Sequence, residues 1–523
     1  MEKTRKTLTW LFYLLFAVCF TFVIANIILQ NQYYDTLYLI LVTICVLIGL
    51  YWIYKLPEKY NAFLDKQYTK ILIIFAAVMF VIELLIGISL RSELIFDIGN
   101  INKGAREWVE TGSFESFYQY YYYCPNNLAP MAFLYIFFKL ASFIGIHDTY
   151  AVAVFLLSVM TALTMALVSL TCKKLAGTKS GIFVLVLFAL SAQFYIMGAA
   201  VYTDAMTMLF PVLIFYLYLI SKEKTKARDK IIIYLLMGIT AAIGSMLKFT
   251  VFIMAIAVLI DMVLNKNTIK DSWKAALCFV GITAIAMTAF NSYIYAFHLD
   301  KERAYQDNKP YIHWVMMGLG GNGLYNQSDS NFTDAMKPEE RTEKVTQEII
   351  KRVKERGAAG MFDLFVTKSS IDLGDGTYGL SDTINYTPLH ETKLRDWVVE
   401  KSKHFNKYAT YSTAVHISLL IFMLLGAWYF VFRKNKLSGK MLPLYLSIFG
   451  LWAFLLLWES NKRYFSNFAP LIFICGTLGI DAFISAKNKF TQELKFGMKN
   501  EINDTEPTET AQNETALPSG EPN

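Results

Sequence analysis

Long, uninterrupted runs of apolar residues dominate the hydrophobic pattern of this chain, and short polar or cationic stretches separate them. The runs Leu8 to Leu29, Thr36 to Tyr54 and Ile71 to Leu90 are each long enough to cross the roughly 30 Å hydrocarbon core of a bilayer as a helix. Similar runs recur as far as residue 486. The pattern predicts an all-α polytopic membrane protein with about 12 transmembrane helices.

Two segments do not read as simple crossings. Residues 130–146 are interpreted as re-entrant or interfacial, because a full crossing would invert the topology of everything that follows. Ile231 to Leu264 holds two spans in only 34 residues, so either both helices are short or the turn between them, which contains Lys248, is sunk below the membrane surface. Non-helical backbone at that depth indicates a cavity that is lined by protein or filled with water.

The distribution of charge indicates how the chain is oriented. It has 49 Lys and Arg against 42 Asp and Glu, a formal net charge of +7, and its cationic clusters follow alternate apolar runs, as they do on the cytoplasmic side of membrane proteins. We therefore expect a multi-pass protein of the cell membrane with both termini in the cytoplasm and no nucleic-acid partner. The first run is interpreted as a retained span, because no small-residue cleavage site follows it. The cationic clusters are Lys55–Lys70, Lys173–Lys179, Lys222–Lys230, Lys266–Lys274, Arg433–Lys440 and Lys487 onward.

The composition excludes a soluble cytosolic enzyme. Hydrophobic residues make up 55% of the 523 residues and charged residues 17%, against roughly 25% charged residues in soluble domains. Five of the six cysteines lie in or at the end of apolar runs, so we expect neither a disulfide framework nor cysteine chemistry.

The runs and loops divide the chain into five parts. Residues 71–297 form a transmembrane core whose first outer loop spans 91–129, and residues 298–410 form a large outer insert, which we expect to be a lobe of mixed secondary structure. The other parts are two N-terminal transmembrane helices with a cytoplasmic loop (1–70), the C-terminal transmembrane helices (411–486) and a disordered cytoplasmic tail (487–523).

Two Gly-rich stretches, residues 318–326 and 373–379, lie in this insert. Neither has the strand-before, helix-after context of a phosphate-binding loop. Between them, Pro338 to Arg356 reads as a solvent-exposed helix with acid-to-base pairs at four-residue spacing, such as Glu340 with Lys344. The insert's histidines lack the spacing of a zinc motif, so no metal site is assigned.

Two acidic residues lie where outer loops meet spans. Asp97 follows the run that ends at Leu90, and it reads either as a functional carboxylate at the membrane boundary or as a helix-ending residue in contact with water. Asp204, next to Tyr202, reads either as part of an outer site or as a helix N-cap. Glu83 in mid-span is expected to face the bundle interior.

Two cations lie on the same predicted face. A lone Lys248 would cost about 2.5 to 3.5 kcal/mol at the bilayer centre, which favours an anionic partner over a side chain that snorkels to water. Arg463 defies the cationic-inside pattern, and its planar guanidinium suits phosphate, although a salt bridge to Glu459 would also explain it. The run Tyr120 to Tyr123 is typical of an aromatic belt at the headgroups and is compatible with a sugar site.

With these residues and the Pro-Asn-Asn turn at Pro125 to Asn127 in order, the chain resembles the GT-C superfamily of polytopic glycosyltransferases, and within it the protein-mannosyltransferase-like members of Gram-positive bacteria. The match covers residues 71 to 486. It implies a GT-C-like fold and transfer of a sugar from a polyprenyl-phosphate-linked donor to an extracytoplasmic acceptor, which could be a cell-envelope glycopolymer, a glycolipid or a protein.

The resemblance also implies roles for individual residues. Asp97 matches the general base on the acceptor hydroxyl, and Asp204 would orient the acceptor. Lys248 and Arg463 would hold the departing phosphate. No cofactor is expected, and no motif supports a divalent cation shared by Asp97 and Asp204. The residues that would bind substrate are Asn126, Asn127, Tyr202 and Tyr464.

Two other classes of function stay open from the sequence. A transporter or flippase of a lipid-linked or envelope precursor would explain the many spans and the mid-span Glu83, although only one short helix pair is visible where transporters often repeat such pairs. A non-catalytic envelope assembly protein would use the outer insert to bind a partner.

Overall fold

The computed structural model describes residues 2–30, 35–55, 60–433 and 436–485, and the tail predicted from residue 487 lies outside them. Within these ranges the protein is helical, and ten helices are long and apolar enough to cross a membrane. Two shorter apolar helices, Thr178–Leu190 and Phe249–Leu264, accompany them. The predicted all-α polytopic architecture is therefore confirmed, with a helix number close to the one expected.

The spans follow the predicted apolar runs. Most are single helices, whereas the fifth joins two, α9 and α10, and the last begins with a short 3-10 turn, η7. In chain order they are α1 (Glu2–Leu29), α2 (Thr36–Tyr54), α3 (Asn61–Ser89), α7 (Thr149–Ala176), α9 (Thr203–Thr207) with α10 (Leu209–Ser221), α11 (Ala227–Leu247), α13 (Lys266–Phe297), α20 (Phe405–Phe432), α21 (Lys436–Leu457) and Ser466–Ser485, which contains η7 (Ser466–Phe468); the two short ones are α8 (Thr178–Leu190) and α12 (Phe252–Leu264).

Polar contacts show which helix ends share a side of the bundle. Asp261 near the end of α12 lies 2.8 Å from the ammonium of Lys222 after α10 and 3.8 Å from the guanidinium of Arg5 in α1. Lys174 at the end of α7 pairs with Glu223 at 2.5 Å. We call this side, marked by Arg5, Lys174 and Lys222, the basic end, and the opposite side the site end.

The segment between α3 and α7 does not change sides. Arg91, just after α3, pairs with Asp148, just before α7, at 2.7 Å, so both flanking spans have their ends at the same level. Between them, α6 (Leu128–Phe143) packs against α4 (Phe96–Thr111) and α7. The structure thus agrees with the interpretation of residues 130–146 as a segment that does not cross.

The short pair of spans is unequal. α11 has 21 residues, whereas α12 has 13 and is preceded by the 3-10 turn η6 (Phe249–Val251). Lys248 between them is extended, with φ −154° and ψ 115°. The predicted non-helical backbone therefore falls on Lys248 itself.

The insert of residues 298–410, which we call the lobe, is helical rather than mixed. The one β-bridge among the described residues joins Ser92 to Pro388 and belongs to no strand. Glu340 and Lys344 pair at 2.5 Å as their spacing predicts. The lobe's helices are α14 (Lys301–Asp307), α15 (Ile312–Gly318), α16 (Gln327–Asp334), α17 (Pro338–Gly374, kinked at Gly357), α18 (Leu380–Ile384) and α19 (Arg395–Val398).

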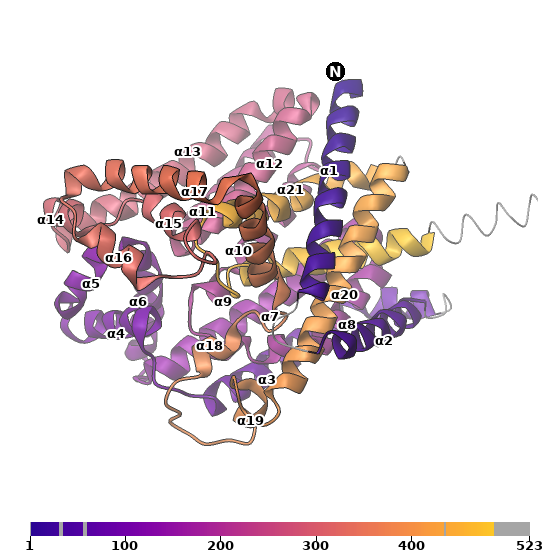
Figure 1. Cartoon of the computed structure of the whole chain (residues 1–523). Coiled ribbons are helices and arrows are strands. Elements are labelled where there is room, and N and C mark those ends of the chain that lie inside the picture. Colours follow the sequence, from indigo (N-terminus) through magenta and orange to yellow (C-terminus); the bar gives the residue numbers. More distant parts are fainter. Residues whose placement is uncertain (1, 31–34, 56–59, 434–435, 486–523) are drawn as a thin grey trace, which may run out of the picture.

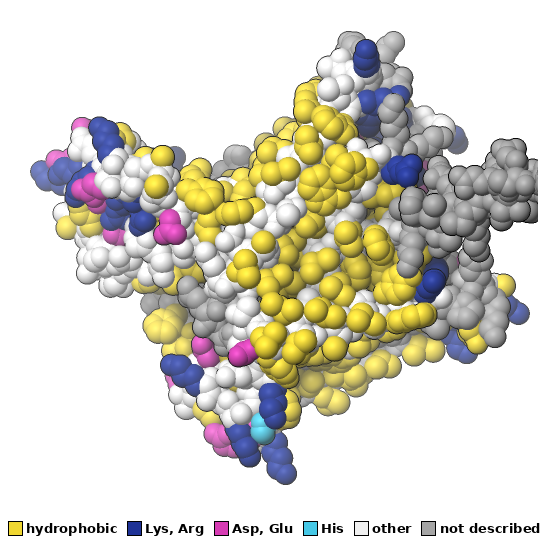
Figure 2. All heavy atoms as spheres, turned by 45° about the vertical axis from the view of Figure 1, so that its right-hand side comes forward, with side chains coloured by type: hydrophobic (Ala, Val, Ile, Leu, Met, Phe, Trp, Pro, Cys, Tyr) yellow, Lys and Arg dark blue, Asp and Glu magenta, His cyan; other side chains and the backbone are white. Residues whose placement is uncertain are grey.

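The lobe lies beside the loop that follows α3. In Figure 1, α14 and α16 gather at the left with α4 and α5 (Tyr118–Tyr123), away from the yellow C-terminal helix. The backbone N–H of Asp300 donates to the hydroxyl of Tyr122 at 3.0 Å, which fastens α14 to α5. Figure 2 shows a broad hydrophobic face with most of the charged side chains at its edges, as expected of a surface in contact with lipid.

Close packing between the late spans gives a first prediction. A Cβ on Gly479 would overlap with the carbonyl oxygen of Phe422 in α20, whereas a Cβ on Gly49 would meet no atom within 4 Å. Gly479→Ala should therefore destabilise the protein by about 1–3 kcal/mol, the usual effect of overpacking. Thermal unfolding in detergent measures this, with Gly49→Ala as the matched control. Equal midpoints for the two variants would contradict the packing described here.

The lobe should be sensitive to acid through His313. Its side chain is fully buried, its Nδ1 lies 2.7 Å from the hydroxyl of Thr333, and burial lowers its pKa to about 4. The pKa of this histidine in the unfolded chain is near 6.5. The free energy of unfolding therefore has its full value above about pH 6.5 and decreases as the pH falls toward 4, by up to ~3 kcal/mol. His313→Gln should flatten that part of the pH dependence of unfolding, whereas His390→Gln, at an exposed position in the lobe, should leave it intact.

Candidate active site

Four segments that are far apart in the sequence meet at the site end. They are the start of α4 with Asp97, the start of α9 with Asp204, the turn at Lys248, and residues 459–464 between α21 and the last span. Asp204 contacts both Lys248 and Arg463 directly. The hydroxyl of Tyr202 joins Asp97 to this group. The convergence predicted for Asp97, Asp204, Lys248 and Arg463 is therefore observed.

Asp97 is held by two tyrosines. The hydroxyl of Tyr120 donates to its Oδ1 at 2.6 Å and the hydroxyl of Tyr202 to its Oδ2 at 3.3 Å. The amide of Asn127 donates to the hydroxyl of Tyr120 at 2.5 Å. Asp97 lies in the first turn of α4, so it begins a helix and does not end one, and it is only partly buried. The carboxylate is oriented by its donors and still accessible.

The backbone just before this carboxylate is strained. Phe96 has a φ of +50°, a value that is rare for a non-glycine residue, and its side chain is 73% exposed. Its ring meets that of Tyr386 in the lobe with centroids 6.1 Å apart. Strain of this kind is typical of functional sites, because the surrounding structure must hold it in place.

Asp204 connects the two cations. It forms a hydrogen-bonded ion pair with Lys248 through Oδ1, and the Nε of Arg463 lies 3.6 Å from its Oδ2. Asp204 is 5% exposed. The N-cap interpretation is wrong, because the residue at the N-cap of α9 is Tyr202. Lys248 has an anionic partner, as the sequence favoured, but that partner is a protein carboxylate. The ion pair of Arg463 is with Asp204 rather than with Glu459.

Two aromatic rings enclose the cations. The guanidinium of Arg463 lies 4.7 Å from the ring centroid of Tyr202 and 5.8 Å from that of Tyr464, and the ammonium of Lys248 lies 5.3 Å from that of Tyr464. Cation–π contacts stabilise a charge without supplying an anion. Tyr202 and Tyr464, both predicted to bind substrate, thus line the cation pair.

The electrostatics keep each group in a defined state. Burial and then the charge of Asp97 raise the pKa of Tyr120, so its phenol stays protonated and serves as a donor. Burial alone would lower the pKa of Arg463, but Tyr202 and Asp204 raise it above its ordinary value. The guanidinium is therefore charged at every accessible pH.

The structure adds Tyr120 to the predicted set and connects it to Asn127, which was already in that set. Asn127 is 2% exposed and bonds Tyr120, whereas Asn126 donates to Asn127 at 3.2 Å and is one step further from Asp97. The sequence places Tyr120 only within the run Tyr120 to Tyr123, an aromatic belt that is compatible with a sugar site, and does not single it out. The short Pro turn η3 (Pro125–Asn127), which ends at Asn127, reverses the chain after Tyr120 and is the one sequence signal that could have placed the two side chains together.

Glu83 is fully buried in α3, as predicted for a mid-span carboxyl that faces the bundle interior. Among residues 2–30, 35–55, 60–433 and 436–485, no group of three or more His, Cys, Asp or Glu side chains is arranged to hold a metal ion.

The fold and this site define a polytopic integral membrane protein with a buried acid and cation cluster at one end of its helix bundle. The chain belongs to the family described as conserved hypothetical integral membrane protein, whose model matches residues 1–484. A comparison with curated proteins gave no match.

Solved structures show a distant likeness. ArnT from Cupriavidus metallidurans bound to undecaprenyl phosphate matches with 10% identity and a TM-score of 0.35, over 79% of this chain and 78% of that one. The oligosaccharyltransferase AglB from Archaeoglobus fulgidus, in complex with an inhibitory peptide and a dolichol-phosphate, matches with 13% identity and a TM-score of 0.38, over 84% of this chain. The apo form of the Archaeoglobus fulgidus enzyme matches with 15% identity and a TM-score of 0.38, over 82% of this chain. This chain spans about half the length of the archaeal enzyme, 52% in both structures.

Proposed function

We propose that this protein is a membrane glycosyltransferase that moves a sugar from a polyprenyl-phosphate-linked donor to an extracytoplasmic acceptor of the cell envelope, a glycopolymer, glycolipid or protein. The observation that carries the proposal is the pairing of an accessible carboxylate, Asp97, with the partly buried cations Lys248 and Arg463 across the single residue Tyr202. A base and a phosphate site at one membrane boundary are what such a transfer needs.

Asp97 acts as the general base. The acceptor hydroxyl loses its proton to the carboxylate while its oxygen bonds to the anomeric carbon, and the bond from that carbon to the phosphate oxygen breaks. Polyprenyl phosphate leaves with the bonding electron pair. The hydrogen bonds from Tyr120 and Tyr202 orient the carboxylate, and attack from the face opposite the phosphate inverts the anomeric configuration.

Lys248 and Arg463 receive the phosphate. They share one carboxylate, that of Asp204, so two positive charges have one direct counter-charge. The guanidinium of Arg463 donates no hydrogen bond to any described residue, and its side chain is 22% exposed. Its planar N–H groups are thus available for the oxygens of a phosphate, where charge grows in the transition state.

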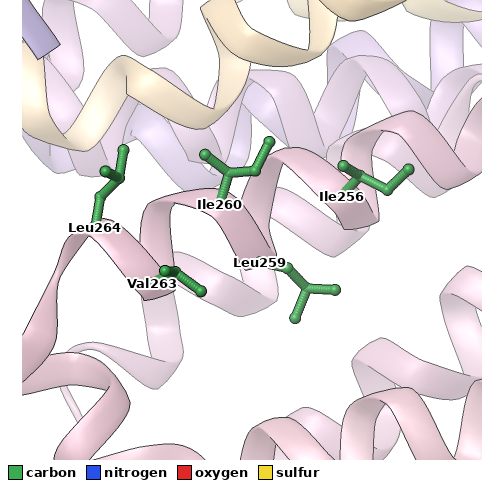
Figure 3. A pocket seen from close by; sticks show the side chains of 5 residues that line it. All are labelled: Ile256, Leu259, Ile260, Val263 and Leu264. Atoms are coloured by element: carbon green, nitrogen blue, oxygen red, sulfur yellow. The ribbon is translucent and has the colours of Figure 1, made fainter. Parts of the chain in front are cut away.

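The donor's hydrocarbon chain would follow α12. This helix begins directly after Lys248 and η6, and an apolar hollow of about 280 Å³ lies along its face, at Ile256, Leu259, Ile260, Val263 and Leu264 (Figure 3). Ile256 lies in the second turn of α12, eight residues beyond Lys248. A phosphate at Lys248 and a chain in the bilayer are therefore compatible with one bound molecule.

The proposed orientation follows from the charges at the other end. Cations gather at the basic end, which the positive-inside rule places in the cytoplasm together with both termini. The site end then faces outward. Reporter fusions within residues 91–129 test this, and a cytoplasmic signal from them would contradict an extracytoplasmic site.

The activity is tested with purified full-length protein and a polyprenyl-phosphate-linked sugar, radiolabelled in the sugar, plus an envelope extract as the acceptor pool. We expect label to enter the acceptor with release of one polyprenyl phosphate per sugar. Movement of intact donor across proteoliposomes without any release would favour a flippase instead, and neither activity would favour an assembly role.

A further inference from the structure

The segment that carries Arg463 is bound along its length by the lobe. The backbone N–H of Ser460 donates to the carbonyl of Gly323 at 2.8 Å. Asp372 in α17 accepts from the hydroxyl of Ser460 at 3.1 Å and from the backbone N–H of Asn461 at 3.0 Å. Lys368, one turn earlier in α17, donates to the carbonyl of Trp458 at 2.5 Å.

These two α17 side chains are buried ionisable groups that bond this segment, and Lys368 also donates to the carbonyl of Gly318 in the lobe at 2.8 Å. Lys368 is fully buried and Asp372 is 3% exposed. Burial lowers the pKa of Lys368 and raises that of Asp372. Such groups are costly to bury, so a short connection that only had to link two helices would be held more simply by apolar packing.

The Gly-rich stretches of the lobe make this contact possible. A Cβ on Gly318 would overlap with the carbonyl of Trp458, and the Cβ of a residue at Gly323, where φ is +85°, would press on the methylenes of Lys368 at 2.9 Å. A Cβ on Gly379, where φ is +61°, would lie 3.3 Å from the backbone nitrogen of Arg463. Both stretches therefore serve the surface that faces residues 458–463.

The contacts lead from α17 to the cation pair. Asp372 holds the backbone of Asn461, and the side-chain Oδ1 of Asn461 accepts from the backbone N–H of Arg463 at 3.2 Å. Arg463 in turn faces Asp204. A shift of residues 460–461 would therefore move the guanidinium relative to Lys248.

We propose that Lys368 and Asp372 are positioning residues, which fix residues 458–463 so that Arg463 and Lys248 together receive the phosphate of the donor. This inference rests on the proposed function. It assigns the lobe a role in binding the donor phosphate, and it makes the buried charges of α17 part of that site without any contact to substrate.

Arg395 offers a matched comparison, because it fastens the same lobe to the connection between α3 and α4, which leads to Asp97. It is 8% exposed and donates to the hydroxyl of Ser92 at 3.0 Å and to the carbonyls of Ile384 at 2.9 Å and Tyr386 at 3.2 Å. Ser92 lies in the connection between α3 and α4, five residues before Asp97, the proposed base. Loss of Arg395 thus loosens the lobe without touching residues 458–463.

The test measures equilibrium binding of radiolabelled polyprenyl phosphate to the purified full-length protein, alongside donor KM and kcat. Asp372→Asn and Lys368→Met should each raise the Kd about tenfold, the usual effect of one lost buried hydrogen bond to a charged group. Arg395→Met should leave the Kd within about twofold and lower kcat. Asn461→Ala leaves Lys368 and Asp372 unchanged and should also raise the Kd. It therefore tests the proposal even if an α17 variant fails to fold.

Arg463→Ala is the reference variant that distinguishes failure of the positioning role from failure of the proposed phosphate site. If Arg463→Ala weakens binding but the α17 and Asn461 variants do not, the positioning role is wrong and the phosphate site stands. If Arg463→Ala itself binds normally, the proposed phosphate site fails. Equal rises in Kd for the Arg395 and Asp372 variants would reduce the lobe to general support of the fold and would overturn the proposal.

Discussion

Asp97→Asn should lower the rate of sugar transfer by about 10²–10⁴-fold, the usual contribution of a general base. The amide is nearly isosteric with the carboxylate: its oxygen can still accept from Tyr120, and its NH2 group can donate to the hydroxyl oxygen of Tyr202, so the local structure should survive. It cannot take the proton of an acceptor hydroxyl. The donor KM should change little, because the phosphate is held elsewhere, by Lys248 and Arg463. Initial rates of label transfer at saturating donor measure the effect.

Glu93→Gln is the matched control for this substitution. Glu93 is an exposed carboxylate four residues earlier, on the same connection between α3 and α4, and only its backbone N–H contacts the lobe, at the carbonyl of Thr387. Its loss should leave the rate unchanged. A purified Asp97→Asn variant that transferred sugar at the parental rate would remove Asp97 from the role of base, whatever the fate of the phosphate site.

The sequence predicted the fold well because the bilayer restricts what a chain can do. A run such as Thr36 to Tyr54 has to be a helix, since backbone groups in hydrocarbon must be satisfied within the segment. The alternation of cationic loops predicted that residues 130–146 do not cross, because a crossing would invert the topology downstream, and the pair of Arg91 with Asp148 agrees with this. The lobe lies outside this constraint, and there the expectation of mixed structure was wrong.

The site was predictable as a set of residues but not as a set of contacts. Asp97, Asp204, Lys248 and Arg463 each stand out because a charge beside an apolar run needs a reason. Which charges pair depends on how the helices pack: Asp204 and Lys248 are 44 residues apart. No local pattern carries that information.

The residues that the sequence missed act through other residues. Tyr120 is one of four consecutive tyrosines, and only the packing of α5 beside α4 singles it out as the donor to Asp97. Lys368 and Asp372 lie beyond the solvent-exposed helix predicted for Pro338 to Arg356, where the kink at Gly357 directs the second half of α17 against α1 and α21. Their burial followed from tertiary structure alone.

Arg463→Ala should weaken the binding of the donor and also slow the reaction. We expect kcat/KM to fall by about 10²–10³-fold, as when a preorganised charge at a leaving group is lost. Its removal leaves Lys248 and Asp204 as a neutral pair, so no net positive charge faces the phosphate. Arg463→Lys should fall between, because it keeps the charge but loses the planar fork. Donor KM and kcat, measured with the labelled donor, give both effects.

The charge argument has its own test in a double variant. If Asp204 offsets the cations, adding Asp204→Asn to Arg463→Ala frees Lys248 and should recover part of the lost donor affinity relative to Arg463→Ala alone. Lys462→Ala serves as the control, because its ammonium lies 3.9 Å from Glu400 instead, and it should keep the parental donor KM. A double variant no better than Arg463→Ala would mean that the guanidinium's geometry matters more than the net charge of the cluster. Parental kcat/KM in Arg463→Ala itself would exclude Arg463 from the phosphate site altogether.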